Sequence, residues 1–103
     1  MSQLALFIKT RCLPDKRDDV RALWEKHLQP HSASNTGQKV YAFCYDNNDA
    51  NVLYLFEIYA SQEAFMSASQ QPWFGAYMQE AGALIDGQPE VGMASPLFTK
   101  GVG

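Results

Sequence analysis

The chain has 103 residues, of which 47% are hydrophobic and 18% charged, and its formal net charge is −3 at pH 7. This length and composition predict one globular domain, residues 1–103, and exclude an intrinsically disordered chain. A weakly acidic chain offers no broad basic surface, so we expect no nucleic-acid partner. No apolar run reaches the ~18 residues that a membrane span needs, and we expect a cytoplasmic protein that has no membrane partner.

Four segments are apolar or alternate between apolar and polar residues, as β-strands do. They cover residues 4–9, 39–45, 52–60 and 90–95. The second and third of these segments are separated only by a short polar loop, which is typical of a β-hairpin.

Helices are predicted between the strands. Pro14, followed by acidic residues, predicts the first turn of one helix, and Pro30 predicts its end. Its apolar face repeats at helical spacing and consists of Val20, Leu23, Trp24, His27 and Leu28. A second helical segment comes in two pieces, with Ser61 as the cap of the first and Pro72 in the first turn of the other. The apolar face of the last piece contains Phe74, Tyr77, Met78, Ala81 and Leu84 or Ile85.

The resulting order is β-α-β-β-α-β. This order predicts an α+β, ferredoxin-like fold in which helices cover one face of a four-stranded antiparallel sheet. Both faces of the predicted strands are apolar, because aromatic residues alternate with other apolar ones in 39–45 and 52–60. We therefore expect a homodimer in which the uncovered faces of two sheets pack together.

Three stretches carry a resemblance to a known family. They are Leu4-Ala5-Leu6-Phe7-Ile8, Phe56-Glu57-Ile58-Tyr59-Ala60-Ser61-Gln62-Glu63-Ala64 and Pro72-Trp73-Phe74. Through them the chain resembles the antibiotic biosynthesis monooxygenase (ABM) family of the dimeric α/β barrel superfamily. The family pattern usually has Trp where this chain has Tyr59, and histidines where this chain has Ala68 and Trp73.

The resemblance implies a cofactor-independent monooxygenase that uses no flavin, metal or haem. Such an enzyme deprotonates a small phenolic, quinol or polyketide-like aromatic compound in an apolar pocket, and the substrate anion reduces dioxygen directly. The protein then supplies a base, a donor for the developing oxyanion and exclusion of water. The missing histidines leave an alternative, a non-oxygenase dimeric-barrel protein that acts as an isomerase or lyase or binds small aromatic compounds.

Glu57 is the first candidate catalytic residue. It shares a strand face with apolar residues, so desolvation is expected to raise its pKa toward the range useful for proton transfer. The alternative is a structural role, in which Glu57 pairs with Arg or Lys or accepts a hydrogen bond from a Tyr hydroxyl. His27 is the second candidate base, since the helical spacing turns it toward the sheet; the alternative for His27 is ordinary packing.

Aromatic residues are the candidates for substrate binding. Tyr59 and Trp73 are predicted to wall the pocket, with ordinary packing at the helix terminus as the alternative for Trp73. Ala68 is expected to enlarge the pocket unless Trp73 plugs it. Tyr41 and Tyr45 either line the pocket or fill the dimer core.

Cysteine and histidine residues provide two further predictions. Cys44 is predicted to be a small buried side chain in its strand. His27 and His31 have the spacing of metal ligands, but Pro30 breaks the helix between them and a third ligand is missing from the pattern, so no metal site is predicted.

Overall fold

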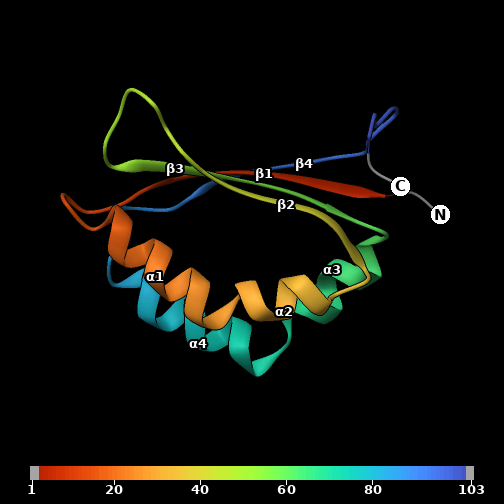
Figure 1. Cartoon of the computed structure of the whole chain (residues 1–103), viewed down its shortest axis with the longest axis horizontal. Helices are drawn as coiled ribbons and strands as arrows, with labels where there is room; N and C mark the ends of the chain where they lie inside the picture. The colour runs from red at the N-terminus through yellow and green to blue at the C-terminus, as the bar shows by residue number, and fades with distance from the viewer. Residues whose placement is uncertain (1–2, 102–103) are drawn as a thin grey trace.

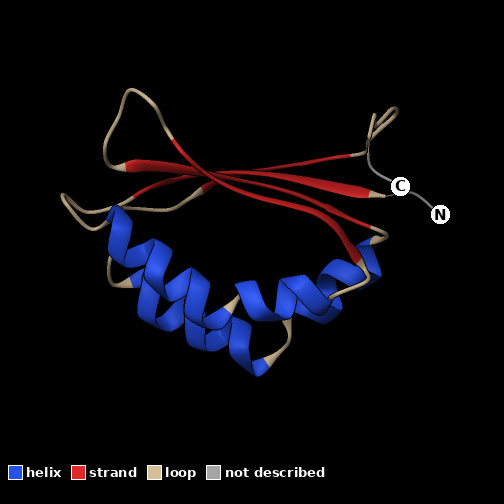
Figure 2. Ribbon diagram, in the orientation of Figure 1, coloured by secondary structure: helices blue, strands red, loops and turns tan. Residues whose placement is uncertain are grey.

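The computed structural model describes residues 3–101 and contains one sheet with helices on one side (Figures 1 and 2). The elements in chain order are β1 (Leu4–Arg11), α1 (Arg17–His27), α2 (Gln29–Ser34), β2 (Gln38–Tyr45), β3 (Val52–Tyr59), α3 (Gln62–Ser69), α4 (Pro72–Gly82) and β4 (Glu90–Ala94). The strand order is β2-β3-β1-β4, and every neighbouring pair is antiparallel. The predicted ferredoxin-like α+β fold is confirmed.

The strand register decides which side chains face the helices. In the central pair, Leu6 lies opposite Glu57 and Ile8 lies opposite Leu55. Successive side chains of a strand point to opposite faces, so these four share one face, and the helices cover it. Phe7 lies opposite Phe56 on the other face, which is uncovered in this chain.

The beginning of the first helix differs from the prediction. Pro14 lies in a turn, where Asp15 adopts a left-handed backbone conformation with φ of 64°, and α1 begins only at Arg17. Aspartate is among the non-glycine residues that tolerate this conformation best. Pro14 and Asp15 thus form the turn that connects β1 to α1.

Pro30 also behaves differently from the prediction. It lies in the first turn of the short helix α2, where the N–H that proline lacks is not needed. His31 is consequently a helical residue rather than a loop residue. The two other predicted helix starts are confirmed: the Ser61 hydroxyl accepts a hydrogen bond from the backbone N–H of Ala64 at 3.1 Å, and Pro72 occupies the first turn of α4.

Three clusters of buried side chains form the core: the first two join the sheet to the helices, and the third packs α1 against α4. They are Leu6, Tyr59 and Ala68; Cys12, Val20 and Leu53; and Leu28, Tyr77 and Ala81. The prediction for Cys44 is wrong, because it is exposed. Cys44 lies opposite Tyr54, so the alternation of β2 puts it on the uncovered face.

No helix within residues 3–101 has the length and apolar character needed to cross a membrane.

Candidate functional site

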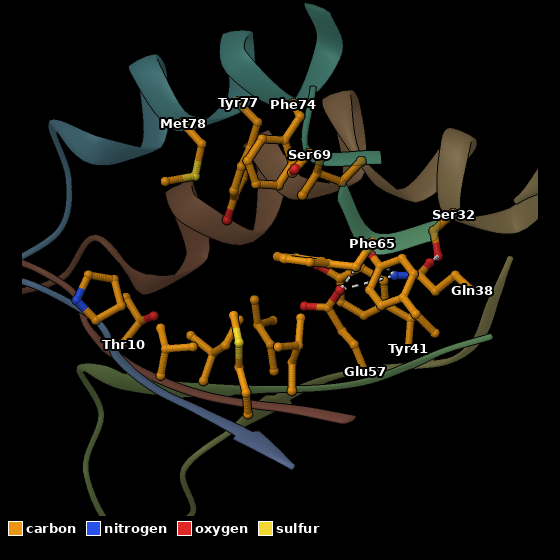
Figure 3. Close-up of a pocket in the computed structure, with 18 of the residues that line it drawn as sticks. Thr10, Ser32, Gln38, Tyr41, Glu57, Phe65, Ser69, Phe74, Tyr77 and Met78 are labelled. Atoms are coloured by element: carbon orange, nitrogen blue, oxygen red, sulfur yellow. Dashed lines mark hydrogen bonds between the residues drawn. The ribbon is translucent and has the colours of Figure 1, made fainter. Parts of the chain in front are cut away.

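A cavity of about 360 Å³ lies between the sheet and the helices (Figure 3). Leu6, Ile8 and Leu55 line it from the sheet, and Phe65 and Phe74 line it from α3 and α4. Its size and its largely apolar walls suit a small aromatic molecule.

Exposed side chains mark the mouth of the cavity. Met78 of α4 and Val91 and Met93 of β4 all line the cavity, yet 48%, 56% and 62% of their respective surfaces are exposed. β4 is the edge strand of the sheet. The cavity therefore opens to solvent between α4 and β4.

A cluster of hydrogen-bonded side chains lies inside the cavity around Glu57. The Tyr59 hydroxyl and the Gln38 side-chain amide both donate to Glu57 Oε1, at 3.0 and 3.1 Å. Gln38 also donates to the Tyr59 hydroxyl at 3.0 Å, and the Ser32 hydroxyl of α2 donates to Gln38 Oε1. Dashed lines in Figure 3 follow these bonds.

Strand geometry brings this cluster together. Glu57 and Tyr59 are two residues apart on β3 and therefore share a face. Gln38 of β2 lies directly opposite Tyr59, and the register shifts between Gln38 and Val40. This irregularity lets Gln38 reach the helix-covered face together with Tyr41, three positions further along.

Glu57 is a buried carboxyl group without a cationic partner. Only 6% of its surface is exposed, and within residues 3–101 no Lys, Arg or His forms an ion pair with it. Burial raises the pKa of Glu57 above its ordinary value, while the hydrogen bonds from Tyr59 and Gln38 lower it in part. Of the two structural roles considered for Glu57, the tyrosine hydrogen bond is present and the ion pair is not.

Three tyrosines line the cavity together with Glu57. Burial raises the pKa of both Tyr41 and Tyr59, and the charge of Glu57 adds to the rise. Burial also raises the pKa of Tyr77 to about 12, with smaller contributions from Cys12 and Glu57. All three phenols are thus neutral near pH 7 and can donate hydrogen bonds to an anionic oxygen.

The structure brings four of the predicted site residues to the cavity, namely Glu57, Tyr59, Tyr41 and Trp73. His27 is not among the residues that line it. The prediction that His27 faces the sheet is wrong: its Nε2 lies 2.5 Å from Glu80 Oε2, in the contact between α1 and α4. The apolar face of α1 packs partly on the sheet and partly on α4. His27 is the last residue of α1, and this C-terminal end of the helix contacts α4.

Tyr45 and Ala68 also lie outside the cavity lining. The Tyr45 hydroxyl donates to Asp18 at 2.7 Å, and the Arg17 guanidinium lies 3.7 Å from the centre of its ring. Ala68 lies on the buried side of α3, where it packs against Leu6 and Tyr59.

Trp73 lies at the border between the cavity and the protein surface. It lines the cavity and also stacks on His31, with ring centroids 4.4 Å apart and planes inclined by 7°. Trp73 therefore forms a rigid wall at a position where the family pattern usually has histidine.

Sequence reasoning missed five polar residues of the cavity: Thr10, Ser32, Gln38, Ser69 and Tyr77. Tyr77 was identified only as part of the apolar face of α4. The pairing of Gln38 with Tyr59 was open to prediction from a hairpin register, but Ser32 depends on the unpredicted helix α2. Within residues 3–101 no three His, Cys, Asp or Glu side chains are grouped in a way that could hold a metal ion.

Comparisons with known proteins identify the family and agree with the fold. The model of the family described as antibiotic biosynthesis monooxygenase matches residues 4–80. A Chloroflexus aurantiacus protein with the same family description is 22% identical, with a TM-score of 0.86 over 99% of this chain and 100% of the other. The Mycobacterium tuberculosis protein Rv0793 is 27% identical, with a TM-score of 0.83 over 96% of this chain and 99% of the other. No curated protein matches the chain.

Proposed function

Because the chain belongs to the antibiotic biosynthesis monooxygenase family, we propose that it oxidises a small phenolic, quinol or polyketide-like aromatic compound with dioxygen in the cavity around Glu57. The observation that carries the proposal is the Glu57 carboxyl group, which is buried in an apolar cavity; among residues 3–101 it has no cationic partner and accepts hydrogen bonds from the neutral side chains of Gln38 and Tyr59.

In the proposed reaction Glu57 is the base. A carboxylate whose pKa is raised by burial is better matched to proton abstraction near neutral pH than an ordinary one. Gln38 and Tyr59 hold Glu57 Oε1 by hydrogen bonds, which leaves Oε2 available for the substrate proton. The two partners thus orient the base as well as compensate its burial.

The neutral tyrosines have the second role. Deprotonation places a negative charge on the substrate oxygen, and hydroxyl donors held around it stabilise that charge in an environment of low polarity. Tyr41 lines the cavity and lies directly opposite Glu57 in the strand register, so it is suited to this role. The substrate anion then transfers electrons to dioxygen. One oxygen atom enters the organic product, and the other leaves as water with the two hydrogens that the substrate loses.

The protein needs no cofactor in this proposal, because the electron-rich substrate is itself the reductant. The apolar walls keep water from the reacting anion. Trp73 and Phe74 contribute to these walls from α4.

One observation supports a second candidate function, a binding protein for small aromatic compounds or a non-oxygenase enzyme of the same superfamily. Among residues 3–101, Glu57 is the only acidic or basic side chain that lines the cavity, and Trp73 stands in the lining where the family pattern usually has histidine. A binding protein needs only the cavity. A monooxygenase also needs a base, and Glu57 would have to supply it without the help of a histidine.

Oxygen uptake separates the two functions. We would supply quinols and anthrones to the protein in metal-free buffer and compare the wild type with Glu57→Gln. The monooxygenase proposal predicts substrate-dependent oxygen uptake that the substitution removes. If no compound consumes oxygen above the background rate although compounds bind, the binding function is correct instead.

We also propose that the protein acts as a homodimer that pairs two sheets into an α/β barrel. Phe7 and Tyr54 are 52% and 37% exposed on the uncovered face, and the ring of Phe7 lies 5.0 Å from that of Phe56. A second copy would remove these aromatic rings from water. Both cysteines are free thiols, which is consistent with a cytoplasmic location.

A further inference from the structure

Thr10 and Tyr77 line the cavity with polar side chains that have no part in the Glu57 cluster, whereas the hydroxyl of Ser69, a further lining residue outside that cluster, donates to the Met66 carbonyl at 2.9 Å. Thr10 of β1 is 4% exposed and Tyr77 of α4 is 7% exposed. Within the described residues no hydrogen bond joins either side-chain hydroxyl to another residue, and neither hydroxyl is sealed off from the cavity that both residues line. Figure 3 shows Tyr77 reaching from α4 into the space above the sheet, with Thr10 at the side of the cavity away from Glu57.

The strand register sets the separation of the two polar regions. Leu6 lies opposite Glu57, and Thr10 lies four residues further along β1, opposite Leu53. Four residues of an antiparallel strand span roughly 13 Å. Between the two regions the sheet presents apolar side chains to the cavity, among them Ile8, Leu55 and Val91. The cavity is thus polar at two ends and apolar in the middle.

The charges of the lining restrict the ligand further. No Lys, Arg or His is found among the described lining residues, and Glu57 is the only acid. An anionic group brought into this cavity would lose its hydration without gaining a cation, which is strongly unfavourable. The cavity therefore selects against carboxylates, sulfates and phosphates.

We propose that the substrate is an elongated, uncharged aromatic compound with an oxygen-bearing group at each end, one end held by Glu57 and the other by Thr10 and Tyr77. This inference rests on the proposed function, since it identifies the substrate class of that same cavity. Thr10 and Tyr77 act as specificity-determining residues: they bind the end of the molecule that does not react and so hold the reacting end at Glu57.

The chemistry of the two hydroxyls fits this role. Each can donate one hydrogen bond and also accept one, so they accommodate a hydroxyl or a carbonyl group equally well. A ligand that lacks an oxygen at this end covers both hydroxyls without offering them a hydrogen-bond partner, which is unfavourable. The discrimination therefore comes from the penalty for the wrong ligand as well as from the gain for the right one.

Calorimetric titration of biphenyl compounds tests the inference, and oxygen-free buffer keeps binding separate from turnover. The probes are 4,4′-dihydroxybiphenyl, which has an oxygen at both ends, and 4-hydroxybiphenyl, which has one. We expect the dihydroxy compound to bind about tenfold more tightly, the effect of one additional hydrogen bond. Replacing Thr10→Val together with Tyr77→Phe should abolish this preference, because both substitutions remove a hydroxyl and keep the shape of the side chain.

The matched control is Tyr54→Phe, which removes a hydroxyl that donates to Asp46 outside the cavity, at 2.7 Å. It should keep the preference. If the double variant does not fold, the single variant Tyr77→Phe is used and should reduce the preference, while the comparison of the two ligands on the wild type stands by itself.

A third probe, 4′-hydroxybiphenyl-4-carboxylate, tests the exclusion of anions and should bind more weakly than 4-hydroxybiphenyl. Equal affinity for the mono- and dihydroxy compounds, or a preference that survives in the variants, would overturn the inference and leave the monooxygenase proposal to its own oxygen assay. Tight binding of the carboxylate would overturn the uncharged substrate class. Binding of none of the three would overturn both the inference and the assignment of this cavity as the site.

Discussion

The two faces of the sheet have similar sequence patterns and different surroundings. Successive side chains of β1, β2 and β3 point to opposite faces of the sheet, and apolar or aromatic side chains lie on both faces. Helices of the same chain cover one face and leave a cavity that contains Glu57. The other face presents Phe7 to solvent, with 52% of its surface exposed. The difference shows that alternation alone identifies two surfaces to bury, while the covering elements decide which of them becomes a site.

The two faces also differ in the surroundings of their carboxylates. On the uncovered face Glu90 is exposed and lies opposite Lys9 at the edge of the sheet. On the covered face Glu57 is 6% exposed and has only neutral hydrogen-bond donors. Hydration and a nearby cation stabilise an ionised carboxylate, and Glu57 lacks both. The covered face thus holds a carboxylate that gains from accepting a proton.

The largest expected effect is on catalysis at the covered face. Glu57→Gln keeps the size of the side chain and removes the base, so we expect kcat/KM for oxygen uptake to fall by roughly 10²–10⁴-fold. The control is Glu80→Gln, which changes an exposed carboxylate between α1 and α4. If the Glu57 variant keeps more than a third of the wild-type rate, another group is the base.

The next effect is on assembly at the uncovered face. Phe7→Glu places a charge where two sheets are proposed to pack, and we expect dimer dissociation to become at least 100-fold more favourable, as for a central interface residue. Sedimentation velocity measures this change. Met66→Glu is the control, because Met66 is similarly exposed, at 47%, but lies on α3. A wild-type protein that is monomeric at micromolar concentration would contradict the pairing of the faces.

A smaller effect is expected for the residue that sequence reasoning placed at the wrong surface. His27→Ala removes the partner of Glu80 between α1 and α4. We expect the free energy of unfolding to fall by about 0.5–1 kcal/mol, typical of a partly exposed pair, and kcat/KM to stay within about threefold of the wild type. Chemical denaturation and oxygen uptake measure the two quantities. A hundredfold loss of activity in a folded variant would restore His27 as a candidate base.

The smallest effect is the pH dependence of stability. The pKa of Glu57 is higher in the folded protein than its ordinary value of 4.5, so the folded state binds more protons above that pH. Stability from this group is therefore fully present below pH 4.5 and falls as the pH rises through the folded pKa. Relative to the wild type, Glu57→Gln should become more stable as the pH is raised from 4 to 8. Denaturation of both proteins over this range measures the difference, and a constant or opposite difference would contradict a raised pKa.

Local sequence signals predicted much of this fold. Alternation gave the strands, and the Ser61 cap and Pro72 gave two helix starts that the structure contains. The same alternation identified Glu57 as a carboxylate on an apolar face. These features depend on residues close together in the chain.

The missed features depend on contacts between distant segments. The periodicity of α1 places His27 on the apolar face of the helix, but it does not predict that α4 packs against the C-terminal end of α1. Gln38 reaches Glu57 because of a register shift in β2, and Ser32 reaches Gln38 because α2 continues past Pro30. Long-range register and helix packing thus decided which polar groups surround the carboxylate.

The protonation of Glu57 tests the account most directly. The carboxyl carbon of this residue, labelled with ¹³C, can be followed by NMR as the pH is raised, with Glu57→Gln to assign the signal. We predict that the carboxyl group titrates above 4.5 and that its midpoint coincides with the rising limb of the pH profile of kcat/KM. A midpoint at or below 4.5, or a rising limb that persists in the Gln variant, would contradict the role of Glu57 as the buried base.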